Sequence, residues 1–129
     1  VGAPSMNFID GRLSTGNGTV AIELPGGARV GLEGYKFARA PQDGQPATLG
    51  VRPEQMSLNG TGNGGAHLPI TLNMVESMGA DSLAWGNVAG TLASMRVEPD
   101  QDVPIGTVVD ASFHPENASL FDKGSGERL

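Results

Sequence analysis

The stretch ATLGVRPEQM, residues 47–56, combines a strand pattern with an abrupt stop. Its apolar residues alternate with smaller or polar ones up to Val51, which is the pattern of a strand with one face on the core. Pro53 has no N–H to donate to a sheet ladder and its ring keeps Arg52 extended, so the strand must end there. We predict that Arg52, Pro53 and Glu54 form a structural motif at the rim of a sheet, with Glu54 accepting from Arg52 or from a neighbouring turn.

Strand patterns recur on both sides of this segment. Glycine occurs 20 times and proline 9 times in 129 residues, which favours short strands joined by tight turns. No amphipathic helix longer than two turns is evident, so the fold class predicted is all-β, a small barrel or sandwich of about eight or more strands with very little helix. The expected strands cover residues 6–13, 19–24, 28–32, 48–52, 68–74, 82–88, 91–97 and 107–113.

The strand predicted at residues 68–74 carries two irregular features. Pro69 falls on its outward side, which indicates an edge strand or the start of a strand. Met74 and Val75 are both apolar and break the alternation, as a bulge or a strong bend would.

Two further expectations concern the second half of the chain. The strand at residues 82–88 offers Leu83 and Trp85 to the core, and a lone tryptophan on a strand is more often a core side chain than a stacking platform. The strand at residues 107–113 is expected to be the last one. Residues 114–122 are then expected to form one short helical turn.

Composition excludes several classes of function. The net charge of −6 disfavours electrostatic binding of nucleic acid, and the absence of cysteine excludes disulfides and thiolate metal sites. No apolar run approaches the roughly 20 residues of a membrane-spanning helix, and the N-terminus lacks the basic start and apolar block of a signal peptide. Because the chain begins with Val1, we expect it to be a piece of a longer polypeptide.

The motifs that usually carry chemistry are weak here. Gly60, Gly62 and Gly65 form a G-x-G-x-x-G pattern, but a strand pattern follows it, so a flexible loop is expected rather than a phosphate site. His67 and His114 are far apart and are expected to be surface or strand-end residues. The sequence contains no Walker A motif and no G-x-S-x-G elbow. We therefore expect no catalytic residue, metal ligand or cofactor in these residues.

Residues 50–54, GVRPE, resemble the signature in the C-terminal domain of the ATPase subunits of sugar-type ABC importers, of which the maltose importer is the best known. The resemblance covers nearly the whole chain. The sequence departs from the family pattern at Ser119, where histidine usually precedes Leu-Phe-Asp, and in a longer glycine-rich insert at residues 59–65. Four further segments agree in the same order, residues 2–13, 75–88, 103–122 and 126–129.

The resemblance implies a transport-associated OB (TOBE) domain, an OB-like β-barrel forming a single domain over residues 1–129. In the parent subunit this domain follows an ATPase domain that is absent from this sequence, so this part is expected not to be an enzyme, while the parent binds ATP and Mg. The resemblance also implies a homodimer held partly by this domain, permease subunits as partners, and in some relatives a regulatory protein. The location implied is cytoplasmic, at the inner face of the cell membrane, without insertion.

Two functions follow as hypotheses. The first is a regulatory domain that stabilises a dimer, with exposed candidates in the turn containing Glu76 and Gly79 and in the loop around Tyr35. The alternative is a module that binds a small ligand such as a sugar, in which Trp85 would stack on the ligand. Neutral sugars need only aromatics and hydrogen bonds, and the net charge disfavours oxyanions and oligonucleotides.

Overall fold

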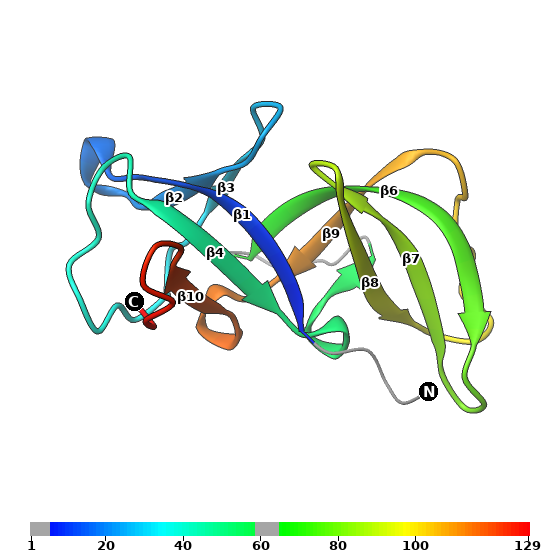
Figure 1. Ribbon diagram of the computed structural model, residues 1–129. Helices are drawn as coiled ribbons and strands as arrows, with labels where there is room; N and C mark the ends of the chain where they lie inside the picture. Colours follow the sequence, from blue (N-terminus) through cyan, green and yellow to red (C-terminus); the bar gives the residue numbers. More distant parts are fainter. Residues whose placement is uncertain (1–5, 59–64) are drawn as a thin grey trace.

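The computed structural model describes residues 6–58 and 65–129 (Figure 1). Within these ranges the chain forms ten strands in two five-stranded sheets, every pairing being antiparallel, and its helical turns are three short 3-10 segments. The sheets curl strongly, so the predicted all-β, OB-like fold with very little helix is confirmed. The 3-10 segments are η1 (Gly16–Gly18), η2 (Pro53–Gln55) and η3 (Pro115–Asn117).

The two sheets are built from separate parts of the chain. The first has the strand order β10-β4-β1-β2-β3, and the second has the order β5-β9-β6-β7-β8. We call them sheet A and sheet B. Sheet A comprises β1 (Asn7–Ser14), β2 (Ala21–Glu23), β3 (Arg29–Gly31), β4 (Pro46–Val51) and β10 (Ser119–Asp122). Sheet B comprises β5 (Ser57–Leu58), β6 (Ala66–Ser77), β7 (Ser82–Val88), β8 (Thr91–Val97) and β9 (Val108–Phe113).

The inward faces of both sheets share one hydrophobic core. Alternate residues of each strand point inward, so β1 contributes Ile9 and Leu13 while β4 contributes Leu49 and Val51. Leu49 and Val51 are fully buried, as the alternation predicted. In β6 the inward set is Leu68, Ile70 and Leu72, which are also fully buried.

The two sheets are joined where β4 runs through η2 into β5. Arg52 has φ −75° and ψ 145°, the extended backbone predicted for a residue before proline, and Pro53 is buried. A second connection comes from Asn7 at the start of β1. Its side chain accepts from the backbone N–H of Ser94 at 2.9 Å and donates to the Ser94 carbonyl at 2.8 Å, so it occupies the edge of β8 as a neighbouring strand would.

The pairing of β6 with β7 and β9 tests the two irregular features predicted for this strand. The register of β6 on β7 shifts between Leu72 and Met74, which confirms the predicted bulge. The expectation of an edge strand is wrong, because β6 lies between β9 and β7. Pro69 lies opposite Asp110 of β9, and the pairing of β6 with β7 begins only at Thr71. Because β7 is not yet paired at this position, the proline interrupts no hydrogen-bond ladder on that side.

Two other expectations are also corrected. Trp85 does not face the core: Ala84, Gly86 and Val88 form the inward set of β7. Gly86 is so close to the Thr71 carbonyl that even a Cβ atom would overlap it, so only glycine fits at this position.

The strand at residues 107–113 is not the last. After η3, β10 pairs with β4 over four positions, so sheet A is completed by the C-terminal part of the chain. The short helical turn expected within residues 114–122 is present as η3, whereas Ser119–Asp122 form a strand in which Leu120 is buried opposite Leu49.

Candidate functional site

The hairpin of β6 and β7 projects beyond the rest of sheet B, at the lower right of Figure 1. We call residues 73–85 the β6–β7 hairpin. Its turn is closed by a hydrogen bond from the Met78 N–H to the Asp81 carbonyl at 2.8 Å. Gly79 has φ +87°, a left-handed backbone that glycine adopts without strain, so its place in the turn is explained by conformation.

The three predicted ligand or interface residues all belong to this hairpin. The Trp85 indole N–H donates to Glu76 Oε1 at 3.2 Å, and Gly79 lies in the connecting turn. Trp85 pairs with Met74 across the strands, so the indole lies on the outward face of β7 and is half-buried. The structure therefore brings these residues together on one projecting element.

Apolar side chains on the same hairpin are exposed. Met74 is 52% exposed, Val75 is 41% exposed and Met78 is 40% exposed. Sequence reasoning identified the bulge beside Met74 but did not identify this surface. On β7, Ser82, Leu83 and Ala84 remain buried, so the exposed part of the hairpin is the end of β6 and the turn, residues 73–81. Neighbouring exposed apolar side chains of this kind often mark a contact surface.

The Arg52, Pro53 and Glu54 motif has a structural position at the junction of the sheets. Pro53 is buried, while Arg52 and Glu54 are exposed, and the described residues contain no ion pair between them. The alternative in which Glu54 accepts from Arg52 is therefore wrong, and two side chains in water gain little by pairing. Glu54 instead lines a cleft of about 250 Å³ together with Arg96 and Gln101.

Tyr35 does not lie free on its loop. Its hydroxyl donates to the Leu129 carbonyl at 2.9 Å and accepts from the Leu120 N–H at 3.2 Å. The ring also packs edge-on against Phe37, with 4.7 Å between centroids. These contacts fasten the loop to β10 and to the C-terminal residues, so Tyr35 itself has a structural explanation.

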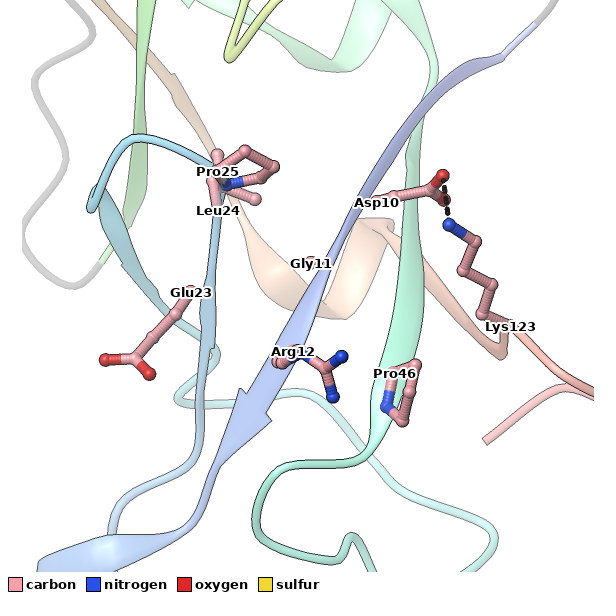
Figure 2. A pocket seen from close by; sticks show the side chains of 8 residues that line it. All are labelled: Asp10, Gly11, Arg12, Glu23, Leu24, Pro25, Pro46 and Lys123. Atoms are coloured by element: carbon pink, nitrogen blue, oxygen red, sulfur yellow. Dashed lines mark ion pairs between the residues drawn. The ribbon is translucent and has the colours of Figure 1, made fainter.

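A pocket of about 370 Å³ opens on sheet A, where β1 passes the turn after β2 (Figure 2). Asp10 accepts from Thr48 Oγ1 at 2.7 Å and lies 3.1 Å from Lys123 Nζ. The Thr48 hydrogen bond, followed by Lys123, lowers the pKa of Asp10 below its ordinary value. Arg12 donates to the Gly44 carbonyl at 3.1 Å. Sequence reasoning missed this pocket because Lys123 reaches it from the far end of the chain.

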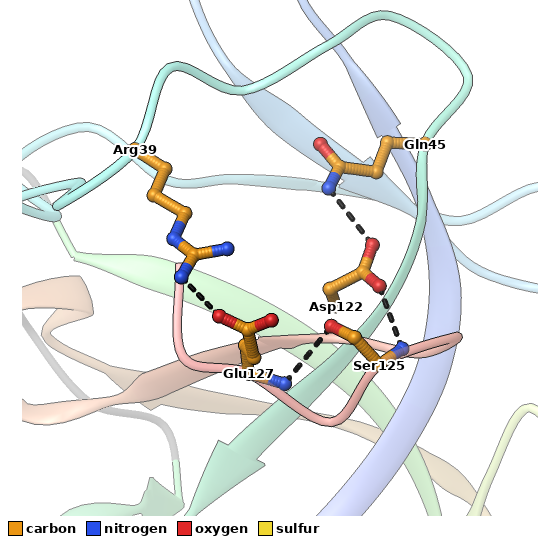
Figure 3. A network of polar contacts seen from close by, with 5 residues as sticks. All are labelled: Arg39, Gln45, Asp122, Ser125 and Glu127. Atoms are coloured by element: carbon orange, nitrogen blue, oxygen red, sulfur yellow. Dashed lines mark hydrogen bonds and ion pairs between the residues drawn. The ribbon is translucent and has the colours of Figure 1, made fainter.

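A polar network holds the C-terminal segment against the loop before β4 (Figure 3). Gln45 Nε2 donates to Asp122 Oδ1 at 2.9 Å, and the Ser125 N–H donates to Asp122 Oδ2 at 2.8 Å. The Gln45 hydrogen bond, followed by those of Ser125, lowers the pKa of Asp122. Arg39 and Glu127 form an ion pair beside them. This network explains the placement of the tail and requires no ligand.

The remaining motifs add little chemistry. His67 Nδ1 lies 2.9 Å from Asp110 Oδ2 and His114 Nδ1 lies 3.6 Å from Glu116 Oε1, and both imidazoles are about half exposed. Gly60 and Gly62 lie outside the described residues. Over residues 6–58 and 65–129, no three or more potential ligands gather as a metal site would require.

The same described ranges contain no helix with the length and hydropathy of a membrane span.

Comparison with known families and proteins gives consistent matches. The model of the MalK OB-fold domain matches residues 2–56, and the model of the TOBE domain matches residues 49–121. The sn-glycerol-3-phosphate import ATP-binding protein UgpC of Salmonella paratyphi A is 32% identical over 130 residues, covering all of this chain and 34% of that protein. UgpC of Escherichia coli K12 is 30% identical over 129 residues, with the same coverage. The chain thus spans about a third of the length of these relatives.

A solved structure has a similar fold. The cytoplasmic molybdate-binding protein ModG, determined with molybdate bound, superposes with a TM-score of 0.64. The match covers 93% of this chain and 98% of ModG at 20% sequence identity. At this identity the likeness extends to the fold alone.

Proposed function

The chain belongs to the TOBE domain family, and from this premise we propose that it serves as the dimer-stabilising, non-catalytic domain of the ATP-binding subunit of a sugar-type ABC importer. The support is the alignment of the whole chain with part of the UgpC proteins, which are named as import ATP-binding proteins. In this proposal the chain performs no chemistry. Its work is to keep two subunits in contact while their ATPase parts open and close.

The observation that carries the proposal is the exposed apolar surface of the β6–β7 hairpin. Met74, opposite Trp85, and Val75, opposite Ala84, lie on the two faces of the end of β6, and Met78 lies in the turn. A two-fold axis near the turn brings this exposed end of a second copy against them. Burial of these side chains removes apolar area from water, which favours association. The hydrogen bond between Trp85 and Glu76 holds the outward face of the hairpin in a fixed shape.

The strength expected of this contact is modest. A stable interface buries about 800 Å² on each partner, and one narrow hairpin offers only part of such an area. We therefore expect weak self-association of these residues alone and a stronger dimer in the parent subunit. ATP and Mg belong to the ATPase part of that subunit in this proposal.

The remaining partners follow from the same role. The parent subunit docks on permease subunits at the cytoplasmic face of the membrane, and a regulatory protein reaches the exposed rim of the domain. The relatives named as import ATP-binding proteins support this assignment.

Sedimentation velocity of the chain at increasing concentration tests the proposal. Val75→Asp places a charge in the hairpin contact and is expected to abolish the faster-sedimenting species. Val108→Asp is the matched control, because Val108 is 67% exposed on β9 and lies outside the hairpin. Equal association of wild type and Val75→Asp, or equal loss in both variants, contradicts a hairpin contact.

The alternative function, binding of a small ligand, is supported by the pocket on sheet A rather than by Trp85. The indole N–H of Trp85 is already bonded to Glu76, whereas the pocket on sheet A offers several polar groups with spare hydrogen-bonding capacity. ModG is named as a molybdate-binding protein, but the carboxylates of Asp10 and Glu23 in this pocket disfavour an oxyanion.

A further inference from the structure

The pocket on sheet A is lined by residues on both sides of Gly11. In Figure 2, Glu23, Leu24 and Pro25 lie on one side of Gly11, and Asp10 and Lys123 lie on the other. A Cβ at Gly11 would approach the Glu23 carbonyl oxygen to 2.5 Å, so the close passage of β1 and β2 requires glycine here. The missing side chain would point toward the buried Ile22, and Gly11 contributes its backbone to the lining of the pocket.

The polar groups of this pocket retain unused hydrogen-bonding capacity. Arg12 has five N–H donors, of which the structure assigns one to the Gly44 carbonyl. Lys123 has three donors, and its ammonium contacts Asp10 at 3.1 Å. The Glu23 carboxylate is 55% exposed and lies 3.9 Å from Arg29, which leaves its oxygens accessible as acceptors. Donors and acceptors thus line the same pocket.

The balance of charge decides which ligands fit. Arg12 and Lys123 carry positive charge, and Asp10 and Glu23 carry negative charge. An anion is attracted by the two cations but repelled by the two carboxylates. A cation is attracted by the carboxylates but repelled by Arg12 and Lys123. A hydroxyl group avoids both, because it donates one hydrogen bond and accepts two.

The volume and the apolar surface of the pocket further restrict the class of ligand that fits. The volume of about 370 Å³ lies near the lower end of ligand pockets, and the exposed rings of Pro25 and Pro46 supply apolar surface against which the C–H face of a sugar ring packs. We propose that this pocket, formed by Asp10, Arg12, Glu23 and Lys123 around Gly11, binds a neutral polyhydroxyl compound the size of a mono- or disaccharide. This activity is separate from self-association through the hairpin and does not depend on it.

A titration of the chain followed by amide chemical shifts in two-dimensional NMR tests the proposal. Glucose and sucrose are the neutral probes, and glucose 6-phosphate is the charged counterpart of glucose. We expect saturable shifts at Gly11, Arg12 and neighbouring amides, with Kd in the millimolar range because the pocket is open. Glucose 6-phosphate is expected to bind several-fold more weakly than glucose. An absence of saturation with both neutral probes, or tighter binding of the phosphate, overturns the proposal.

Variants connect the shifts to the pocket. Arg12→Ala removes a charged donor and is expected to weaken binding about tenfold. Arg96→Ala is the matched control, since Arg96 is a similarly exposed arginine on sheet B that lies 3.7 Å from Asp81. Glu23→Gln supplies a milder second variant, expected to weaken binding several-fold without disturbing the Arg12 contact. Equal affinity in wild type, Arg12→Ala and Glu23→Gln overturns the proposal, as does an equal loss in Arg96→Ala.

Discussion

Similar apolar side chains are buried at the junction of the two sheets and exposed on the β6–β7 hairpin. At the junction, Pro53 and Met56 are buried and the Asn7 amide satisfies both backbone groups of Ser94. At the end of β6, methionine and valine side chains are exposed, and residues 74–77 of this strand pair only with β7.

This difference separates residues that stabilise the fold from residues available for contact. At the junction, loss of a side chain leaves a cavity or an unpaired polar group, both of which cost stability. At the hairpin, the same loss leaves the folded state almost unchanged, because the side chain is already in water. Substitutions in the two regions should therefore affect different measurements, folding in one and association in the other.

The largest expected contrast lies within β6 itself. Leu72 is fully buried just before the bulge and Met74 is exposed just after it. Leu72→Ala should lower the free energy of unfolding by about 2–5 kcal/mol, whereas Met74→Ala should change it by about 0.5 kcal/mol or less. Urea denaturation measures both. Similar losses in the two variants would mean that the hairpin is part of the core.

Asn7 tests whether the junction depends on its polar contacts. Asn7→Ala leaves the Ser94 N–H and carbonyl without their partners in a buried position and should cost roughly 2–4 kcal/mol. Asn87→Ala is the matched control, because Asn87 is exposed on β7. Thermal unfolding compares the melting temperatures of the two variants. Equal melting temperatures would show that the Asn7 contacts do not stabilise the junction.

Tyr35 gives a smaller effect of the same kind. Tyr35→Phe keeps the ring contact with Phe37 and removes the hydroxyl that bonds Leu129 and Leu120. We expect a loss of about 1–2 kcal/mol in urea denaturation, with faster hydrogen exchange at the Leu120 amide. Unchanged exchange at this amide would show that the hydroxyl does not fasten β10.

The smallest effect expected is electrostatic. Because the pKa of Asp10 is lowered in the folded state, its contribution to stability is present above the ordinary value of 3.8 and is lost as the pH falls through the lowered value. As an exposed group it should contribute no more than a surface pair, about 0.2–1 kcal/mol.

Urea midpoints measured at pH 7 and pH 3 should therefore fall less for Asp10→Asn than for wild type. Asp102→Asn, in the exposed loop after β8, serves as the control. A fall in Asp10→Asn equal to that of the wild type would contradict the role given to Lys123 and Thr48.

Local patterns in the sequence were sufficient to predict much of this fold. Alternation identified Leu49, Val51 and the inward residues of β6, and the paired Met74 and Val75 identified the bulge. These features depend on neighbours in sequence, which periodicity reports. In β7, Leu83 is buried as predicted but Trp85 is not, because Ala84, Gly86 and Val88 face the core and the Thr71 carbonyl of another strand admits only glycine at position 86.

The candidate site was less predictable for a related reason. Glu76 and Gly79 were predicted in one turn and Trp85 separately, and the register of β6 on β7 places Trp85 beside Glu76. The exposure of Met74 follows from the hairpin extending past the barrel, a property of the tertiary structure. Lys123 joins Asp10 through the pairing of β10 and β1 with β4, which no local pattern contains.

Cysteine cross-linking tests the hairpin contact most directly, because the sequence contains no cysteine and any disulfide reports the introduced residue alone. Ala80→Cys places a thiol in the exposed turn of the hairpin, and Ala40→Cys places one in the exposed loop before β4. Under mild oxidation, we expect the Ala80→Cys variant to form a cross-linked dimer much faster than the Ala40→Cys variant. Adding Val75→Asp to Ala80→Cys should suppress this cross-link. Equal rates for the two cysteines, or no effect of Val75→Asp, would contradict the hairpin contact.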